Sequence, residues 1–373
     1  MSNFGAEERS LLNDSARQYF ETEYPFERFA DNSAQRVGAG WDQESWRECA
    51  RLGWLGVAVD DEVGGAGGGM TELAIVVAAA GRQLALEPWS ATCAVAMYLL
   101  EQAAGDAARA QLKQAMSGDL TPIVCHYEPD GGYARDYVKT VATADGDGFV
   151  LNGAKTFALH AGHADLLLIS ARIGDDTGPL SVFAVSADVP GLKRTAGAAL
   201  DGRHGASVTL SNVSCANGAL LYEPGVDADA HVQRALDRGA LANAAEAAGA
   251  MAAVSEQTLE YLKNRQQFGK PLTSFQILQH RLVDMSMQSE ETRAVVMRAL
   301  VAMDAGAEDC REIVWQTKML TSRAAQAVGG EAVQLHGGMG MTDELAIGHY
   351  YKRLLVCASQ YGDGDWYAGQ LSA

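Results

Sequence analysis

The fold and the function of this chain are best approached through two glycine-containing segments in its C-terminal third, Arg265-Gln-Gln-Phe268-Gly269-Lys-Pro-Leu272 and Gln334-Leu-His-Gly337-Gly338-Met-Gly340. Each segment places polar side chains beside glycine in a region whose apolar spacing is otherwise helical. Glycine allows backbone to approach a ligand closely, and backbone N–H groups and a guanidinium both bind phosphate. The two segments therefore predict a site for a phosphate-bearing ligand.

The composition of the chain is that of a globular protein with several domains. Its 373 residues are 48% hydrophobic, and its net charge is −18. This length predicts two or three domains. The negative charge disfavours nucleic acid or an anionic membrane as a partner, because phosphate-rich surfaces would repel it.

The cysteines and the N-terminus indicate the compartment. The six cysteines lie far apart without short paired spacings, so we expect reduced thiols rather than disulfides or a metal site. The N-terminal residues show no basic segment followed by an apolar run, and no stretch approaches the roughly 18 apolar residues of a membrane span. We therefore expect a cytoplasmic protein without a signal peptide or membrane helix.

The periodicity along the chain predicts an α+β multidomain protein. Helical spacing from about residue 7 to 114 is interrupted by a glycine-rich loop at 63–69. Short β-rich runs then alternate with turn signals and predict an antiparallel, barrel-like domain with strands near 137–143, 149–151, 166–171, 180–185 and 207–213. Long helical patterns follow and predict a C-terminal four-helix bundle at 232–265, 276–305, 312–328 and from 345 onward. The expected domains are 1–120, 121–225 and 226–373.

This helix, sheet, helix order resembles the acyl-CoA dehydrogenase family, and matching local patterns run along nearly the whole chain. Besides the two opening segments they include Leu52-Gly-Trp-Leu-Gly-Val-Ala-Val59, Gly81-Arg-Gln-Leu-Ala-Leu-Glu-Pro88, Asn152-Gly-Ala-Lys155 and Ser274-Phe-Gln276. In that family a carboxylate removes a proton next to a CoA thioester while FAD accepts a hydride from the following carbon. The resemblance implies an oxidoreductase acting on CH–CH bonds, with FAD, an acyl-CoA substrate and electron-transfer flavoprotein as electron acceptor.

Five residues of the opening segments match family positions that hold the adenine and pyrophosphate part of FAD. By the resemblance, Arg265, Phe268, Gln334, Gly337 and Gly338 reach this part of the cofactor from a neighbouring subunit. A guanidinium can pair with pyrophosphate through two charge-assisted hydrogen bonds. Glycine at both later positions would let backbone N–H groups approach the ligand.

The segments that line the flavin ring in the family are altered in this chain. His126-Tyr127-Glu128-Pro129 stands where the family commonly has Thr-Glu-Pro, and Phe157-Ala158-Leu159 stands where it has Trp-Ile-Thr. Phe157 can still cover an aromatic face, but the aliphatic Leu159 cannot donate a hydrogen bond to the ring. Glu128 and Pro129 either shape a turn or belong to the site. The ring pocket of this chain therefore looks degraded.

The carboxylate base of the family has no counterpart at its usual place. By alignment with the resemblance it would fall at Tyr361 or Gly362, and a second location used by some relatives falls at Gly239. None of these can ionise as a carboxylate. Asp363 and Asp365 are weak catalytic candidates, because a shorter side chain displaced by one or two residues would need a different backbone path, and small misplacements cost rate.

Two residues near the start of the long helical pattern at 232–265 are candidates for substrate binding. Asp237 matches an aspartate that some relatives use near the acyl-CoA. The arginine expected three residues later is Ala240, and Arg238 is its possible substitute.

Together these features predict the non-base subunit of a heteromeric (α2β2) acyl-CoA dehydrogenase. Members of this kind include enzymes for bulky CoA thioesters such as steroid side chains, so lipid metabolism and steroid degradation are expected. One alternative is a self-sufficient homotetrameric dehydrogenase with Asp363 or Asp365 as base. Another is a non-redox binding or scaffold protein on the same fold, and an oxidase variant also stays open.

Overall fold

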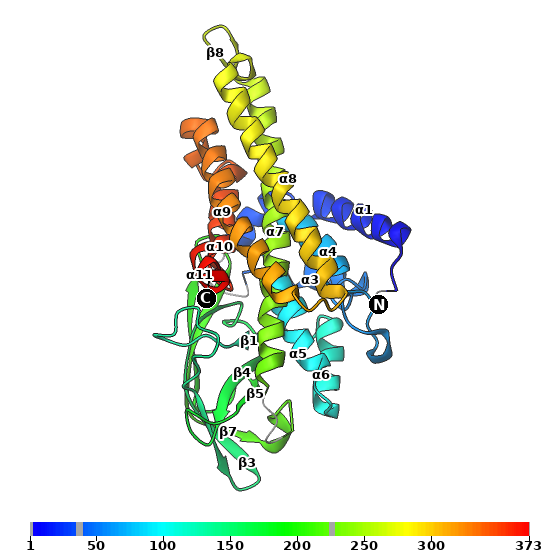
Figure 1. Ribbon diagram of the computed structural model, residues 1–373, viewed down its shortest axis with the longest axis vertical. Helices are drawn as coiled ribbons and strands as arrows, with labels where there is room; N and C mark the ends of the chain where they lie inside the picture. Colours follow the sequence, from blue (N-terminus) through cyan, green and yellow to red (C-terminus); the bar gives the residue numbers. More distant parts are fainter. Residues whose placement is uncertain (1–2, 35–39, 224–227, 373) are drawn as a thin grey trace. The chain divides into compact units, whose positions relative to one another are not determined.

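The computed structural model describes residues 3–34, 40–223 and 228–372 (Figure 1). Its internal contacts divide the chain into two compact units. We call one the helical unit, which contains Met1–Ser33, Met70–Ala85 and Ala240–Ala373, and the other the sheet unit, which contains Ala34–Gly69 and Leu86–Gly239. Helix α7 (Asp229–Asn264) begins in the sheet unit and continues into the helical unit. The predicted domain boundary at 225 and 226 lies outside the described residues.

The sheet unit is built on one seven-stranded sheet in the order β1-β4-β2-β3-β7-β6, with β5 paired to β4 (Figure 1). Most pairs are antiparallel, as predicted, but β1 and β2 both pair with β4 in parallel. One face of the sheet carries the buried apolar core, which includes Ile123, Leu167 and Phe183. The strands are β1 (Pro122–Cys125), β2 (Val141–Asp145), β3 (Gly148–Leu159), β4 (Leu166–Ile173), β5 (Leu180–Ser186), β6 (Leu192–Ala198) and β7 (His204–Ala216).

Three of these strands differ from the sequence prediction, and β1 is one that was not predicted. The run predicted to start at 137 becomes β2 only at Val141, because the backbone N–H groups of Lys139 and Thr140 donate to the Glu128 carboxylate instead of to a neighbouring strand. Strand β6 was not predicted. It lies at the end of the sheet, most of its side chains are exposed, and its polar sequence lacks the alternation of a half-buried strand.

Short helices complete the sheet unit. They are α3 (Gln43–Arg51), the 3-10 turn η1 (Asp61–Val63), the π-helix η2 (Trp89–Ala96), α5 (Met97–Glu101), α6 (Asp106–Met116) and the 3-10 turn η3 (Asn217–Ala219). The eight-residue π-helix is unusual, because π-helical turns are rare and usually single. The Thr92 hydroxyl donates to the Pro122 carbonyl, and the Arg238 Nε donates to the Ala94 carbonyl. These two bonds anchor the middle of a wholly buried segment.

Long helices form the helical unit, which includes the predicted C-terminal bundle (Figure 1). They are α1 (Ala6–Glu23), α2 (Phe26–Ser33), α4 (Met70–Arg82), most of α7, α8 (Gln276–Asp304), α9 (Cys310–His336), α10 (Ala346–Ser359) and α11 (Gly364–Ser372), with the 3-10 turns η4 (Leu272–Ser274) and η5 (Gly337–Met341). Asp304 at the end of α8 caps α4 by accepting from the backbone N–H of Met70 and Thr71 at 2.7 and 3.0 Å.

Small residues bring α4 and α7 into close contact. A Cβ added at Gly81 would lie 2.4 Å from the Glu246 carbonyl oxygen, and one at Gly249 would lie 2.1 Å from the Ala78 carbonyl oxygen. Both distances are far below van der Waals contact, so only glycine fits at either crossing point. Across the described residues, no helix is both long and apolar enough to cross a membrane.

Candidate functional site

The first predicted ligand segment is the turn of a small hairpin at the end of α7. Strands β8 (Gln266–Gln267) and β9 (Lys270–Pro271) pair, and the turn between them places Phe268 and Gly269 at φ of 53° and 76°. A left-handed phenylalanine is uncommon. Its ring is 91% exposed, which is a costly place for a large aromatic side chain unless a ligand or partner covers it.

The second predicted segment is the end of α9. Gly337 ends the helix at φ of 61°, and a Cβ added at Gly337 or Gly338 would meet nothing within 4 Å. The Tyr261 and His336 rings stack at 4.2 Å between centroids, which joins the last turn of α7 to the last turn of α9. Because Arg265 follows Tyr261 by one helical turn and Gly337 follows His336 directly, both segments leave the bundle from this contact.

The donors of these two segments are accessible. We call residues 265–269 and 334–338 the tail segments. The side chains of Arg265 and Gln334 are exposed, and neither forms a hydrogen bond or ion pair with any part of the chain that the structure describes. A free guanidinium, a free amide, an exposed aromatic ring and open glycine backbone suit the pyrophosphate and adenine of a dinucleotide. The tail segments therefore fit the end of FAD that the resemblance assigned to them.

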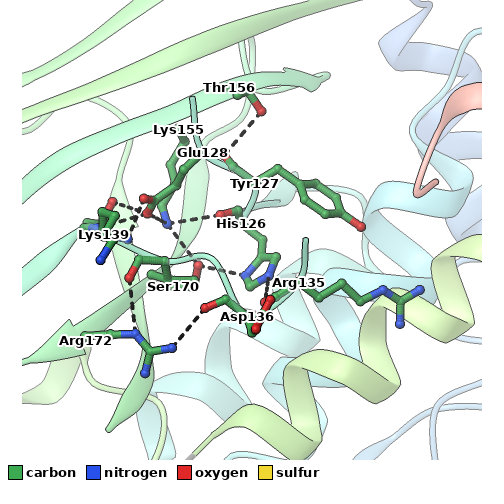
Figure 2. A network of polar contacts seen from close by, with 12 residues as sticks. His126, Tyr127, Glu128, Arg135, Asp136, Lys139, Lys155, Thr156, Ser170 and Arg172 are labelled. Atoms are coloured by element: carbon green, nitrogen blue, oxygen red, sulfur yellow. Dashed lines mark hydrogen bonds and ion pairs between the residues drawn. The ribbon is translucent and has the colours of Figure 1, made fainter. Parts of the chain in front are cut away.

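A buried ion pair lies at the centre of a polar network in the sheet unit (Figure 2). The Lys155 Nζ on β3 donates to the Glu128 Oε1 at 2.6 Å, and the two side chains are 0% and 3% exposed. Glu128 also accepts from the backbone N–H of Lys139 and Thr140, at 2.6 and 3.0 Å, and from the Thr140 hydroxyl at 2.6 Å. Burial opposes ionisation of Glu128, but Lys155 and these hydrogen bonds outweigh it, so the pKa of Glu128 lies below its ordinary value.

A chain of hydrogen bonds extends this network to His126 (Figure 2). The Lys155 Nζ donates to the Ser170 Oγ at 3.1 Å, and the Ser170 Oγ lies 2.9 Å from the His126 Nδ1. Because the Arg135 carbonyl can only accept, the His126 Nε2 at 2.9 Å donates to it, and Nδ1 accepts from Ser170. Burial and then Lys155 lower the pKa of His126 to about 3, which keeps its ring neutral. Burial also lowers the pKa of Lys155, to about 8.

This network predicts a loss of stability in acid. The folded state holds His126 neutral with its pKa lowered from 6.5 to about 3, so the unfolded chain binds a proton first as the pH falls below 6.5. Between pH 7 and pH 5 this histidine should therefore cost about 2 kcal/mol of unfolding free energy. Urea unfolding of the wild type and of His126→Gln, which retains a donor for the Arg135 carbonyl, should show a shallower acid slope for the variant. His280→Gln, at an exposed position on α8, is the control, and equal slopes for all three proteins would contradict this role of His126.

The network holds a compact loop between Pro129 and Val138. In addition to the His126 bond, Arg172 donates to the carbonyls of Asp136, Val138 and Gly178 at 2.8 to 3.2 Å. The Thr156 backbone N–H donates to the Tyr127 carbonyl at 2.9 Å, which places Tyr127 beside the start of the Phe157-Ala158-Leu159 segment. Glu128 thus does more than shape a turn, because it fixes the loop that follows Tyr127.

The predicted substrate residues Asp237 and Arg238 make contacts within the sheet unit. Asp237 is paired with Arg135 at 2.6 Å, and both side chains are nearly inaccessible, with 3% and 5% exposure. The Arg238 guanidinium lies 4.8 Å from the centroid of the Tyr98 ring, besides its bond to the π-helix. Their substrate-binding role stays a prediction, and Asp237 could meet a ligand only by sharing or leaving Arg135.

The expected place of the base is the junction between α10 and α11. Gly362 has φ of 122°, and an added Cβ would lie 2.8 Å from the Tyr367 ring and 2.9 Å from the Trp366 ring. The buried Lys318 Nζ donates to the Gly362 carbonyl at 3.1 Å and to the Cys357 carbonyl at 2.8 Å. This position is therefore built around glycine, and a longer side chain would have to displace two aromatic rings.

The two candidate aspartates of this junction do not have the surroundings that a catalytic base requires. The Asp363 Oδ1 accepts from the backbone N–H of Asp365 and Trp366, at 3.1 and 2.8 Å, and so caps α11. The Asp365 side chain is 97% exposed, and its nearest cation is Arg323 at 3.8 Å. A carboxylate that caps a helix is already engaged, and one in full solvent is not held in the position that a base requires. Their catalytic role stays a prediction that these contacts do not favour.

Several residues of the site carry no sequence signal strong enough to assign them. Arg135 lies 102 positions before its partner Asp237, and Lys155 lies 27 positions after Glu128. A lysine within a β-rich run is a weak indication of a buried ion pair, because such lysines usually sit on an exposed face. No feature of the sequence indicated the contacts of Lys318 with the α10–α11 junction.

Models of three acyl-CoA dehydrogenase domains match the chain, the N-terminal domain at 6–119, the middle domain at 125–213 and the C-terminal domain at 230–365. Short-chain specific acyl-CoA dehydrogenase of Homo sapiens mitochondria is 28% identical over 339 residues, which are 87% of this chain and 82% of that protein. Benzylmalonyl-CoA dehydrogenase of Aromatoleum aromaticum is 27% identical over 359 residues, 91% of this chain and 92% of that protein.

Solved structures agree with these matches. A variant of the Tcur3481-Tcur3483 steroid ACAD has a TM-score of 0.88 at 28% identity and covers 98% of this chain and 97% of its own. Butyryl-CoA dehydrogenase from Megasphaera elsdenii has a TM-score of 0.89 at 23% identity over 100% of both chains, which shows the shared fold. The predicted fold class, with a helical N-terminal part, a central sheet and a helical C-terminal part, is confirmed.

Proposed function

Because this chain belongs to the acyl-CoA dehydrogenase family, whose members bind FAD and oxidise CH–CH bonds, we propose that it is the subunit without the base in a heteromeric acyl-CoA dehydrogenase. A second acyl-CoA dehydrogenase-like chain would supply the carboxylate that removes the α-proton. The observation that carries the proposal is the α10–α11 junction, where Gly362 leaves no room for a longer side chain and Asp363 caps a helix.

The contribution of this chain is then to hold FAD for its partner. Bound FAD supplies the acceptor for the hydride. Arg265 and Gln334 would hold the pyrophosphate and adenine through charge-assisted and amide hydrogen bonds, and Phe268 would cover the adenine face. The exposure of all three side chains supports a role toward another subunit, as does the lack of a hydrogen bond or ion pair at the Arg265 and Gln334 side chains within the described residues.

The proposed substrate is a CoA thioester with a bulky acyl group such as a steroid side chain. Its support is the 28% identity with a solved structure that is named a steroid ACAD and that carries two protein names. We propose electron-transfer flavoprotein as the electron acceptor, in keeping with the resemblance.

Replacing the two aspartates of the junction separates this proposal from a self-sufficient enzyme. In the co-purified complex, Asp365→Ala should leave turnover within about twofold, because a solvated carboxylate makes no transition-state contact. Asp363→Ser retains a helix cap without a carboxylate and should also leave turnover unchanged. A loss of about a hundredfold in either variant, with the melting temperature unchanged, would assign the base to this chain and reject the proposal.

A non-redox scaffold on the same fold is another alternative, and it differs in cofactor content. The proposed dehydrogenase complex should be yellow and release FAD on denaturation. A complex with the expected subunits but without flavin would favour the scaffold instead.

A further inference from the structure

The resemblance places one segment of the sheet unit beside the isoalloxazine ring of flavin, and this segment differs from the family pattern at Tyr127. Tyr127 stands where the family commonly has threonine, and its side chain extends from the network on the same side as that of Arg135 (Figure 2). The Tyr127 hydroxyl oxygen is buried and forms no hydrogen bond of normal geometry with the described residues. Burial raises the pKa of this phenol to about 12, and Arg135, Asp237 and Tyr133 are the ionisable groups that act on it.

The charged Arg135–Asp237 pair lies close enough to this phenol for both of its charges to act on the phenol's pKa. Its 2.6 Å contact joins the loop after Glu128 to the first turns of α7, and it is almost completely removed from solvent. Opening such a pair is unfavourable, because separation would leave two buried charges without compensation. A ligand therefore cannot displace it cheaply.

The loop that carries Arg135 also cannot easily move aside. The Arg135 carbonyl is held by His126, the following carbonyls by Arg172, and the end of the loop by the Glu128 carboxylate. His126 and Glu128 are themselves part of the buried network around Lys155. The bulk of Tyr127 and the ion pair are thus rigidly positioned.

We propose that Tyr127 and the Arg135–Asp237 ion pair close this chain's own flavin-ring site, so that the ring of FAD can be held only in the partner subunit. This inference rests on the proposed function. It explains how a chain whose tail segments hold the FAD of a neighbouring subunit would not bind a flavin ring itself. The residues present do not fit the isoalloxazine ring, since Leu159 offers no hydrogen bond and Tyr127 takes the place of a small hydroxyl side chain.

The test restores the space and measures flavin binding to the isolated chain, without any turnover. The opened variant is Tyr127→Thr/Arg135→Ala/Asp237→Asn, which removes the bulk and both charges together. The matched control is Arg203→Ala/Asp201→Asn, which removes another buried ion pair of the sheet unit with a 2.7 Å contact and side chains 4% and 0% exposed. Riboflavin, which lacks the nucleotide tail, and FAD are titrated by flavin fluorescence, and circular dichroism monitors folding.

The opened variant should bind riboflavin about tenfold or more tightly than the wild type, and the control should not. Tyr127→Thr alone retains the ion pair and should show a smaller gain in the same direction, which keeps the test decisive if the triple variant fails to fold. If either the Tyr127→Thr variant or the triple variant is folded and keeps the wild-type affinity for riboflavin, the ring site is not closed by these residues. That result would leave the proposed function intact. Wild type that binds FAD stoichiometrically and oxidises acyl-CoA alone would instead reject the proposed function.

Discussion

Lys155→Met should destabilise the isolated chain by about 3–5 kcal/mol, because the Glu128 carboxylate would stay buried without its counter-charge. The Glu128 side chain is 3% exposed, and its remaining partners are two backbone N–H groups and one hydroxyl. Loss of the lysine would also remove a donor to Ser170 and to the His126 carbonyl. Urea unfolding followed by circular dichroism at pH 7 measures the change in the free energy of unfolding.

Two controls isolate the effect of burial from the effect of the ion pair itself. The double variant Glu128→Gln/Lys155→Met should recover part of the loss, because it removes both charges together. Lys139→Met breaks the exposed pair with Asp176, which has a 2.7 Å contact and side chains 53% and 48% exposed, and should cost below about 1 kcal/mol. Equal costs for Lys155→Met and Lys139→Met would contradict the buried network.

Arg265→Ala should weaken FAD binding to the complex by about 10- to 100-fold, since charge-assisted hydrogen bonds are worth about 1.5–3 kcal/mol. The fold should be unaffected, because the exposed Arg265 side chain has no hydrogen bond or ion pair with the described residues. FAD dissociation is measured by flavin fluorescence after dilution of the complex.

Lys263→Ala is the matched control for this prediction, because it removes a cation from the same end of α7. Lys263 is exposed and paired with Glu260 at 2.6 Å, and its replacement should leave FAD affinity unchanged. A similar loss for both variants would indicate a general effect of positive charge. No loss for Arg265→Ala would remove the tail segments from the cofactor site.

Much of this architecture could be predicted because periodic apolar spacing is a local property. The long helices α7, α8 and α9 begin within a few residues of their predicted positions, and the glycine segments at 265–269 and 334–338 mark helix ends. Strand β6 could not be predicted, because an exposed edge strand has no buried face to impose alternation. The parallel pairing of β1 with β4 likewise depends on contacts between distant segments.

The site could be predicted only where residue type and spacing were sufficient. The tail segments carry their chemistry within a few consecutive residues, and the five residues assigned to FAD are all exposed. The neutralisation of Asp237 by Arg135 could not be foreseen, because it depends on where a loop 102 residues earlier is held. The capping role of Asp363 is instead a local contact, and it depends on α11 starting at Gly364, which the sequence analysis did not predict.

The central claim is best tested by purifying this chain alone and together with a second acyl-CoA dehydrogenase-like chain as its partner. Native mass, FAD content and oxidation of a bulky acyl-CoA are measured on both preparations. The account predicts an α2β2 assembly that binds FAD, turns over only when both chains are present, and loses turnover when the partner's base glutamate is replaced by glutamine. Stoichiometric FAD and robust turnover in the isolated chain would contradict it.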